Sequence, residues 1–153
     1  MALPAPGRRD MRKFWIWLSM VLLPVMMLVP ARAEDPAPVP EAWQAAITAQ
    51  IVAFRQHDAE AAFVYAAAPF HEGALTAEQF FDAIVGSGYA PIMTSKSHSF
   101  GPYKVLDDGS VGQVVHFVDA DQKLYDAVYA LSLEGSEWRV DGVQMMKVEG
   151  MGV

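Results

Sequence analysis

The chain has 153 residues, a formal net charge of −7 and no cysteine. The absence of cysteine excludes disulfide bonds, thiol catalysis and cysteine metal sites. The excess of acidic residues argues against a nucleic-acid partner, because such binding depends on clustered Lys and Arg. We expect no metal or other cofactor, since no recognised ligand spacing connects the four histidines, which are His57, His71, His98 and His116.

The first 33 residues have the layout of a secretory signal peptide. Basic residues precede an apolar run, Phe14–Pro30, and Ala31-Arg32-Ala33 fits a small-x-small cleavage site. We therefore expect an exported protein, periplasmic or secreted, that is cleaved near Ala33-Glu34 and starts at Met1 or Met11. An uncleaved membrane anchor is disfavoured, because the apolar run is shorter than a span of ~20 residues and contains prolines.

Cleavage would leave an acidic product made of a short spacer and one domain. Residues 34–40 are rich in proline, which predicts an extended spacer. Residues 41–150 have the size of a single domain. From residue 34 onward the chain carries six basic and seventeen acidic residues, a formal charge of −11. After cleavage we therefore expect no stable membrane association, since anionic lipids attract basic segments.

Three helices are predicted in the first half of the domain. Apolar residues recur at helical spacing over Trp43–Phe54. Asp58 is placed to cap a second helix, which Pro69 would end. Thr76–Gln79 matches a capping box that begins a third helix, and Gly86 would end it.

The second half changes to the two-residue period of strands. A polar edge strand is expected over residues 93–100, and longer strands over 111–119, 123–133 and 137–148. Gly135-Ser136 suits a type II′ hairpin turn.

These turns fix the pairing of the last three strands. The turn at Gly135 places Leu131 opposite Val140 and Tyr129 opposite Gly142. A three-residue loop over 120–122 places Val115 opposite Ala127 and Phe117 opposite Tyr125. The apolar residues then gather on one face of the sheet, as in a half-buried antiparallel sheet.

Helices followed by antiparallel strands predict an α+β fold. The apolar face of the sheet must be covered, and the three N-terminal helices are the cover that the sequence offers. We expect these helices to pack in the concave face of a curved antiparallel sheet, which gives a cone with a pocket.

Three segments resemble an uncharacterised bacterial family of short exported proteins that is described only as a domain of unknown function. These segments are Ala53–Pro69, Tyr89–Pro91 and Trp138–Val143. The order of elements more loosely resembles the nuclear-transport-factor-like (SnoaL-like) superfamily, which includes ketosteroid isomerases, polyketide cyclases, dehydratases and non-catalytic binding modules. That resemblance implies a cone-shaped fold and a pocket location. It implies no catalytic residue, because no active-site motif is matched.

The apolar inner face of the predicted sheet contains a few polar groups. Gln113, Tyr125, Tyr129 and Gln144 are expected there, with space beside Gly142. An apolar concavity with a few hydrogen-bonding groups is typical of small-molecule sites. We predict that these four residues bind a small apolar or weakly polar ligand; alternatively, the amides and phenols satisfy one another.

Acid–base chemistry would need an imidazole or carboxylate in a dry pocket. His116 is expected opposite Asp126 on the outer face, where a solvated cross-strand pair is the simpler interpretation. His71, in a loop, could reach the mouth of the cone. His98 lies in a polar segment, and we expect it on the surface.

The outer face of the predicted sheet is apolar near its end, where Val128, Val143 and Met145 would meet. Such a patch favours a homodimer through this face, although scattered exposed apolar residues are also normal.

The sequence thus favours an exported, non-catalytic module that binds a small ligand or a protein partner. The alternatives are an acid–base lyase, isomerase or cyclase that uses the same cavity, and a structural envelope adaptor with a filled cone.

Overall fold

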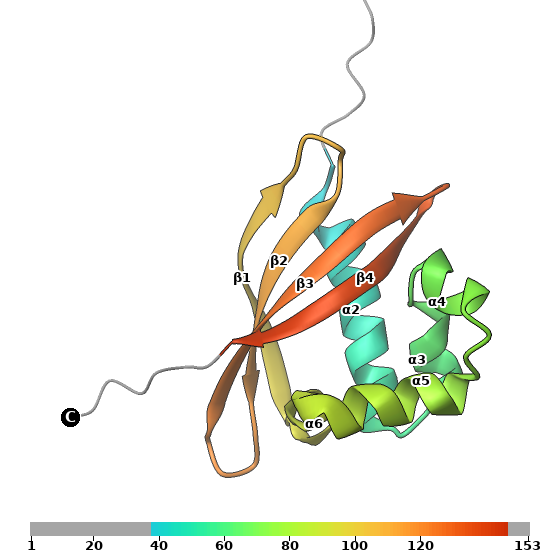
Figure 1. The fold of residues 1–153 in the computed structure, drawn as a ribbon. Helices are drawn as coiled ribbons and strands as arrows, with labels where there is room; N and C mark the ends of the chain where they lie inside the picture. Colours follow the sequence, from blue (N-terminus) through green and yellow to red (C-terminus); the bar gives the residue numbers. More distant parts are fainter. Residues whose placement is uncertain (1–37, 147–153) are drawn as a thin grey trace, which may run out of the picture. The chain divides into compact units, whose positions relative to one another are not determined.

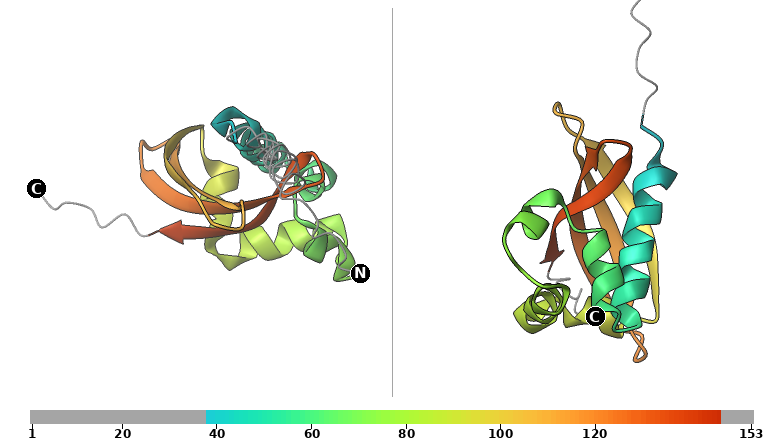
Figure 2. Two further views of the ribbon diagram at one scale, coloured as in Figure 1. Left: turned by 90° about the horizontal axis from the view of Figure 1, so that it is seen from above. Right: turned by 90° about the vertical axis from the view of Figure 1, so that its right-hand side faces the viewer.

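A computed structural model describes residues 38–146 (Figure 1). The predicted signal peptide and most of the predicted spacer lie outside these residues. The described part is an α+β fold in which a four-stranded antiparallel sheet, with its strands in sequence order, is covered by helices on one face (Figure 2). None of the described helices is long and apolar enough to cross a membrane.

Helix α2 (Pro40–Arg55) is the central helix and lies along the sheet. Its predicted apolar stripe is buried, with Trp43, Ile47 and Ile51 fully inaccessible to solvent. The helix ends at Arg55, and His57, two residues further on, adopts a left-handed conformation (φ 57°) while the amide of Asp58 donates to the carbonyl of Ala53. This arrangement satisfies the last helical carbonyls as a Schellman motif does.

The second predicted helix is divided into α3 (Ala59–Val64) and α4 (Ala68–Glu72). Asp58 caps α3 as predicted, since its carboxylate accepts a hydrogen bond of 3.0 Å from the amide of Ala61. The expectation that Pro69 ends a helix was wrong: Pro69 lies in the first turn of α4, where its missing N–H is not needed.

The third predicted helix, α5 (Ala77–Ile84), has the predicted capping box at Thr76. Its α-helical bounds end at Ile84, two residues before the expected Gly86. In the following segment, η1 (Val85–Tyr89), Ser87 and Gly88 depart from helical dihedral angles (Gly88 φ 91°), and a separate short helix, α6 (Ala90–Thr94), begins after this kink. Gly88 thus separates two helices, and the described chain has five α-helices where three were expected.

The sheet consists of β1 (Ser97–Val105), β2 (Val111–Val118), β3 (Leu124–Glu134) and β4 (Glu137–Met146). The predicted pairing of β2 with β3 is confirmed throughout. The pairing of β3 with β4 is confirmed from the Gly135 turn to Leu131 and Val140, where a bulge adds Asp141 to β4. Beyond the bulge the predicted register was wrong by one residue, so Tyr129 lies opposite Val143.

The bulge has a physical reason in the order of side chains along β4. Without it, the alternation that buries Val140 would turn Val143 and Met145 toward solvent and bring Gln144 inside. With it, both apolar side chains pack against the core and Gln144 is exposed. The core therefore lies between the helices and the face that carries Tyr129 and Val140, as predicted.

Candidate functional site

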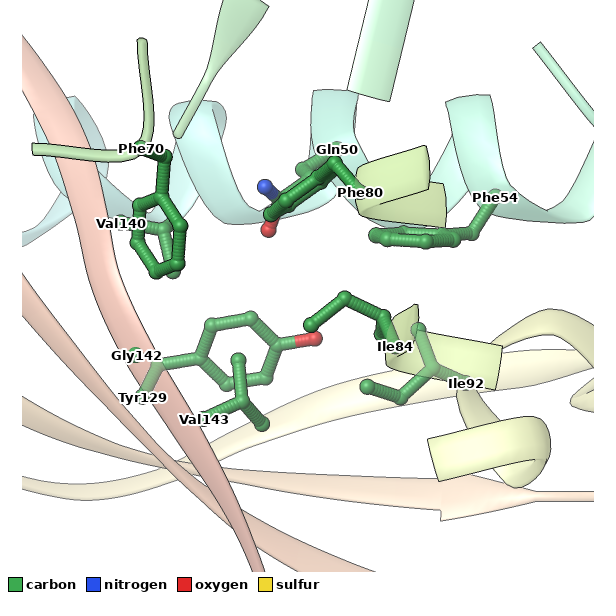
Figure 3. A pocket seen from close by; sticks show the side chains of 10 residues that line it. All are labelled: Gln50, Phe54, Phe70, Phe80, Ile84, Ile92, Tyr129, Val140, Gly142 and Val143. Atoms are coloured by element: carbon green, nitrogen blue, oxygen red, sulfur yellow. The ribbon is translucent and has the colours of Figure 1, made fainter. Parts of the chain in front are cut away.

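An apolar pocket lies between the helices and the sheet (Figure 3). Helices and sheet both contribute apolar side chains to it, and only Gln50 and Tyr129 bring polar side-chain atoms. The space open to the centres of water-sized groups is about 30 Å³. Its lining consists of Gln50, Phe54, Phe70, Phe80, Ile84, Ile92, Tyr129, Val140, Gly142 and Val143.

Tyr129 is the most unusual of these residues. Its side chain is fully buried, and its hydroxyl has no hydrogen-bond partner in the described part of the chain. Burial raises the pKa of Tyr129 well above its ordinary value, with the Arg55 guanidinium acting weakly in the opposite direction. The hydroxyl therefore stays protonated near neutral pH and can donate a hydrogen bond to a bound group.

Gln50 supplies the second polar group and reaches the pocket from α2. It is buried, and its amide nitrogen donates a hydrogen bond of 3.2 Å to the carbonyl of Ala62. Figure 3 shows the amide end of Gln50 directed toward the space above the Tyr129 ring. The pocket therefore offers one hydroxyl and one amide group within an apolar wall.

Gly142 lines the pocket with its backbone. It was expected on the inner face opposite Tyr129, but the bulge pairs it with Ala130, so a Cβ atom would point to the outer face, where it would meet no atom within 4 Å. Phe70, Ile84 and Val143 are only partly buried and form the more accessible side of the pocket. A small group could therefore enter between α5 and β4.

Gln113, which was expected in the pocket, is instead a fully satisfied residue of the core. Its carbonyl oxygen accepts a hydrogen bond of 2.9 Å from the indole of Trp43. Its amide nitrogen donates to the carbonyls of Gly101 (2.9 Å) and Val114 (2.8 Å). The first of these carbonyls lies at a bulge in β1, between Phe100 and Tyr103, so Gln113 satisfies backbone that the sheet leaves unpaired.

Gln144 and Tyr125 also lie outside the pocket. The bulge at Asp141 turns Gln144 to the outer face, where it is exposed opposite Val128. Tyr125 lies on the inner face near the β2–β3 loop, with Lys123 Nζ 5.2 Å from its ring centre. Of the four predicted ligand-binding residues, only Tyr129 lines the pocket.

The same bulge removes the apolar patch that suggested a homodimer. Val143 and Met145 pack against the core instead of joining Val128 on the outer face. Met146, opposite Asp126, is on the outer face and is 45% exposed.

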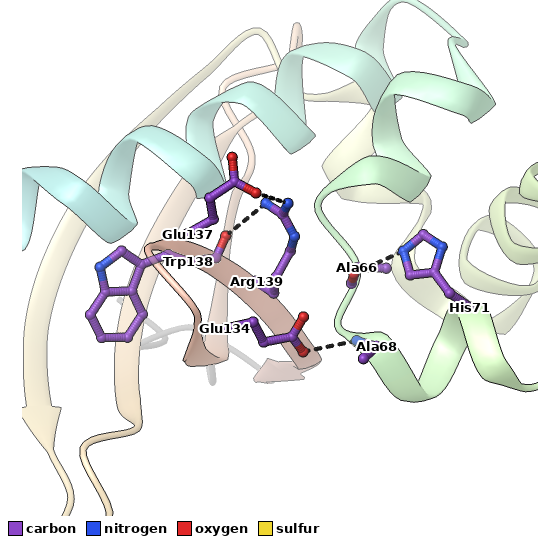
Figure 4. Close-up of polar contacts among 7 residues, drawn as sticks. All are labelled: Ala66, Ala68, His71, Glu134, Glu137, Trp138 and Arg139. Carbon is purple, nitrogen blue, oxygen red and sulfur yellow. Dashed lines mark hydrogen bonds and ion pairs between the residues drawn. The ribbon is translucent and has the colours of Figure 1, made fainter.

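His71 does not line the pocket, although its neighbour Phe70 does. Its Nε2 lies 3.1 Å from the carbonyl of Ala66 (Figure 4), and its ring lies on that of Phe63 with 4.1 Å between centres. In the same region the carboxylate of Glu134 accepts a hydrogen bond of 2.8 Å from the amide of Ala68. The Glu134 contact joins the start of α4 to the β3–β4 hairpin, whereas the His71 contacts hold α4 against α3 and the residues between them.

His116 and Asp126 form the predicted cross-strand pair, with 2.7 Å between Nδ1 and Oδ1. Both side chains are partly exposed, 41% for His116 and 29% for Asp126. They lie on the face of the sheet away from the pocket. Within residues 38–146, no group of three or more His, Asp or Glu is placed to hold a metal ion.

Two residues on the inner side of the fold were not predicted there from the sequence. Gln50 falls on the buried stripe of α2, one residue before Ile51, and this position could have drawn attention to it. His98 was expected on the surface, yet it is half-buried on the inner face beside Phe100 and Phe117. The burial of His98 could have been predicted from the alternation over Ser97–Phe100. Residues two apart share a face of a strand, so His98 lies on the same face as the apolar Phe100.

A family model matches residues 37–153, which is most of the chain and includes every described residue. The chain belongs to the family described as Domain of unknown function (DUF4864). The resemblance to a domain of unknown function is thereby confirmed. A comparison with curated proteins found no match. For this DUF4864 domain, function has to be inferred from the site itself.

Proposed function

We propose that the chain is an exported, non-catalytic binding module whose pocket receives a small, mostly apolar group that accepts a hydrogen bond. The observation that carries this proposal is the buried Tyr129 hydroxyl, which has no partner among the described residues. A buried polar group without a partner costs about 1–3 kcal/mol. A ligand oxygen beside this hydroxyl would offset that cost, whereas a merely structural core would favour Phe at this position.

The size of the pocket limits the ligand. A cavity needs roughly 10–15 Å³ of space open to the centres of water-sized groups to hold one water molecule. The pocket has about 30 Å³ of such space, which accommodates a few heavy atoms. The ligand is therefore a very small molecule, or a larger one that inserts only its end between α5 and β4. The wall of Phe54, Phe80 and Ile92 favours an apolar group around the accepting oxygen.

Acid–base catalysis is less well supported by the same pocket. Its lining includes no carboxylate and no imidazole, and the raised pKa of Tyr129 makes this phenol a poor base near neutral pH. His116, Asp126 and His71, the candidates for such chemistry, all lie outside the pocket lining. Binding therefore remains the better proposal, and we retain the cone-shaped, nuclear-transport-factor-like architecture as part of it.

The proposal is tested by native mass spectrometry of the full chain, expressed with its N-terminal segment and recovered from the cell envelope. We expect a retained small ligand in the wild type and a reduced occupancy in Tyr129→Phe. Tyr125→Phe is the matched control, because it removes a phenol hydroxyl outside the pocket. The mass of the recovered chain also reports leader cleavage and subunit number.

A second variant fills the pocket directly. Val143→Phe enlarges a partly buried side chain of the pocket lining, so it should hinder the ligand without unfolding the protein. Acetone, titrated by NMR, is a suitable probe because it is small and has one acceptor oxygen. Failure of the wild type both to retain a ligand and to show saturable acetone shifts at Tyr129 would favour the filled-core adaptor instead.

A further inference from the structure

A second, polar pocket lies where α2 ends and β1 begins, and it shares no lining residue with the pocket at Tyr129. Its volume is about 480 Å³, which is within the usual range for small-molecule sites. Arg55 and Lys96 line it, together with Ser95, Thr94 and His57. No acidic residue belongs to this lining.

Arg55 is held rigidly by neutral partners. Its Nε and Nη2 atoms donate to the hydroxyl of Ser95, at 3.2 Å and 3.0 Å. Nη2 also lies 3.2 Å from Nδ1 of His98. Within residues 38–146, no carboxylate lies within 4.0 Å of this guanidinium. A half-buried arginine is thus fixed in place with no counter-charge from these described residues.

The contact with Arg55 also fixes the state of His98. An arginine can only donate hydrogen bonds, so Nδ1 of His98 must be the unprotonated, accepting nitrogen. The proton then lies on Nε2, which is 3.1 Å from the hydroxyl of Thr48. Burial, and then the charge of Arg55, lower the pKa of His98, in agreement with a neutral ring.

The remaining donors of Arg55 are free to bind a ligand. Nε and Nη2 are occupied by Ser95 and His98, while neither hydrogen of Nη1 takes part in a bond with the described residues. Lys96, an exposed neighbour in the same lining, has no ion pair within that part of the chain. Two positive charges are therefore concentrated in one pocket, although residues 34–153 carry a formal charge of −11.

We propose that this pocket binds the oxyanion group, carboxylate or phosphate, of a small molecule. Nη1 of Arg55 and the ammonium of Lys96 supply the charge and the donors, which are strong when the acceptor is ionised. Ser95 is a positioning residue: it accepts from Arg55 and donates a hydrogen bond of 3.0 Å to the carbonyl of Ile92. This inference is independent of the ligand proposed for Tyr129.

The test is an NMR titration of the full chain with sodium acetate and, separately, with sodium phosphate, against sodium chloride at equal ionic strength. We expect saturable shifts of the Ser95 and Lys96 amides with at least one of the two oxyanions. Saturation with acetate alone assigns a carboxylate, saturation with phosphate alone assigns a phosphate, and saturation with both assigns a general oxyanion site.

Two variants and one control locate the binding. Arg55→Gln should abolish saturation, and Lys96→Gln should weaken it roughly tenfold. Lys104→Gln removes the same charge from the opposite end of β1 and should bind like the wild type. Because Lys96 is exposed, its variant remains informative even where Arg55→Gln fails to fold. The proposal would be overturned if acetate and phosphate shifted the wild-type amides no more than chloride does. Equal weakening of oxyanion binding by Lys96→Gln and Lys104→Gln would also overturn it.

Discussion

The indole of Trp43 donates a hydrogen bond of 2.9 Å to the side-chain carbonyl of Gln113 and thereby joins α2 to the centre of the sheet. Both side chains are fully buried. Gln113→Leu would leave the indole N–H and the carbonyl of Gly101 without this partner. We expect the free energy of unfolding to fall by about 3 kcal/mol, measured by urea denaturation.

Gln144 provides a matched control for this substitution. It is the same residue type on the exposed face of β4, and Gln144→Leu should change the free energy of unfolding by no more than about 0.5 kcal/mol. Equal losses in the two variants would mean that the buried hydrogen bonds of Gln113 contribute nothing specific.

Tyr129→Phe should behave in the opposite way in the ligand-free protein. The substitution removes a buried hydroxyl that has no partner among the described residues and keeps the aromatic ring. We expect the free energy of unfolding to rise by about 1 kcal/mol, measured on protein freed of any retained ligand. A clear loss of stability would show that the hydroxyl is already satisfied in solution.

His98 should make stability depend on pH. Its pKa is lowered in the folded state by burial and then by Arg55, so the unfolded chain binds more protons as pH falls below about 6.5. The contribution of the neutral ring is therefore complete above that pH and is lost as pH falls through the folded-state pKa. Urea denaturation at a series of pH values from neutral to mildly acidic measures this loss.

His98→Gln is the variant that isolates the effect. Its amide can accept from Arg55 and donate to Thr48, but it does not titrate. The other histidines titrate in both proteins, so their contributions cancel in the comparison. The difference in free energy of unfolding between wild type and variant should therefore shrink or change sign as pH is lowered, because only the wild type loses the contribution of His98. Parallel stability curves would contradict the assigned neutral state of His98.

Gly101 is required by the close approach of β1 to β2. A Cβ atom there would lie 2.6 Å from Nε2 of His116 and 3.1 Å from Cγ1 of Val114. Gly101→Ala should therefore lower the free energy of unfolding by about 2 kcal/mol. Thermal or urea denaturation is sufficient to detect such a change.

Two further variants separate the causes of that loss. Gly112→Ala is a control in the adjacent strand, because a Cβ at Gly112 meets nothing within 4 Å, and it should be close to neutral. Adding His116→Ala to Gly101→Ala should recover part of the stability by removing the nearer obstacle. Without such recovery, Val114 and the backbone would have to account for the whole effect.

The pairing of β2 with β3 could be predicted because two independent signals agree on it. The apolar alternation selects a face, and the loop after Asp119 selects the register; the amide of Asp119 indeed donates to the carbonyl of Lys123. The bulge at Asp141 could not be found in this way. Its reason, the burial of both Val140 and Val143, appears only once the helices define what the face packs against.

The candidate site was predicted only in part, again because the position of the helices does not follow from the pattern of the strands. The sequence placed Tyr129 and Gln113 correctly on the inner face, but alternation cannot distinguish a residue below α2 from one beside a pocket. Trp43 reaches Gln113 and fills that end of the core, while the space beside Tyr129 depends on the path of α5 and α6. That path follows from a kink at Gly88. From the sequence alone, a glycine at this position is equally compatible with the end of a helix followed by a loop.

The extra residue in β4 has a consequence for comparison across the family. An insertion or deletion of one residue at Asp141 would exchange the inward and outward sides of everything that follows in the strand. A family member without it would direct the counterpart of Gln144 toward the helices and that of Met145 toward water. Residue correspondences beyond this point therefore hold only between chains that share the bulge.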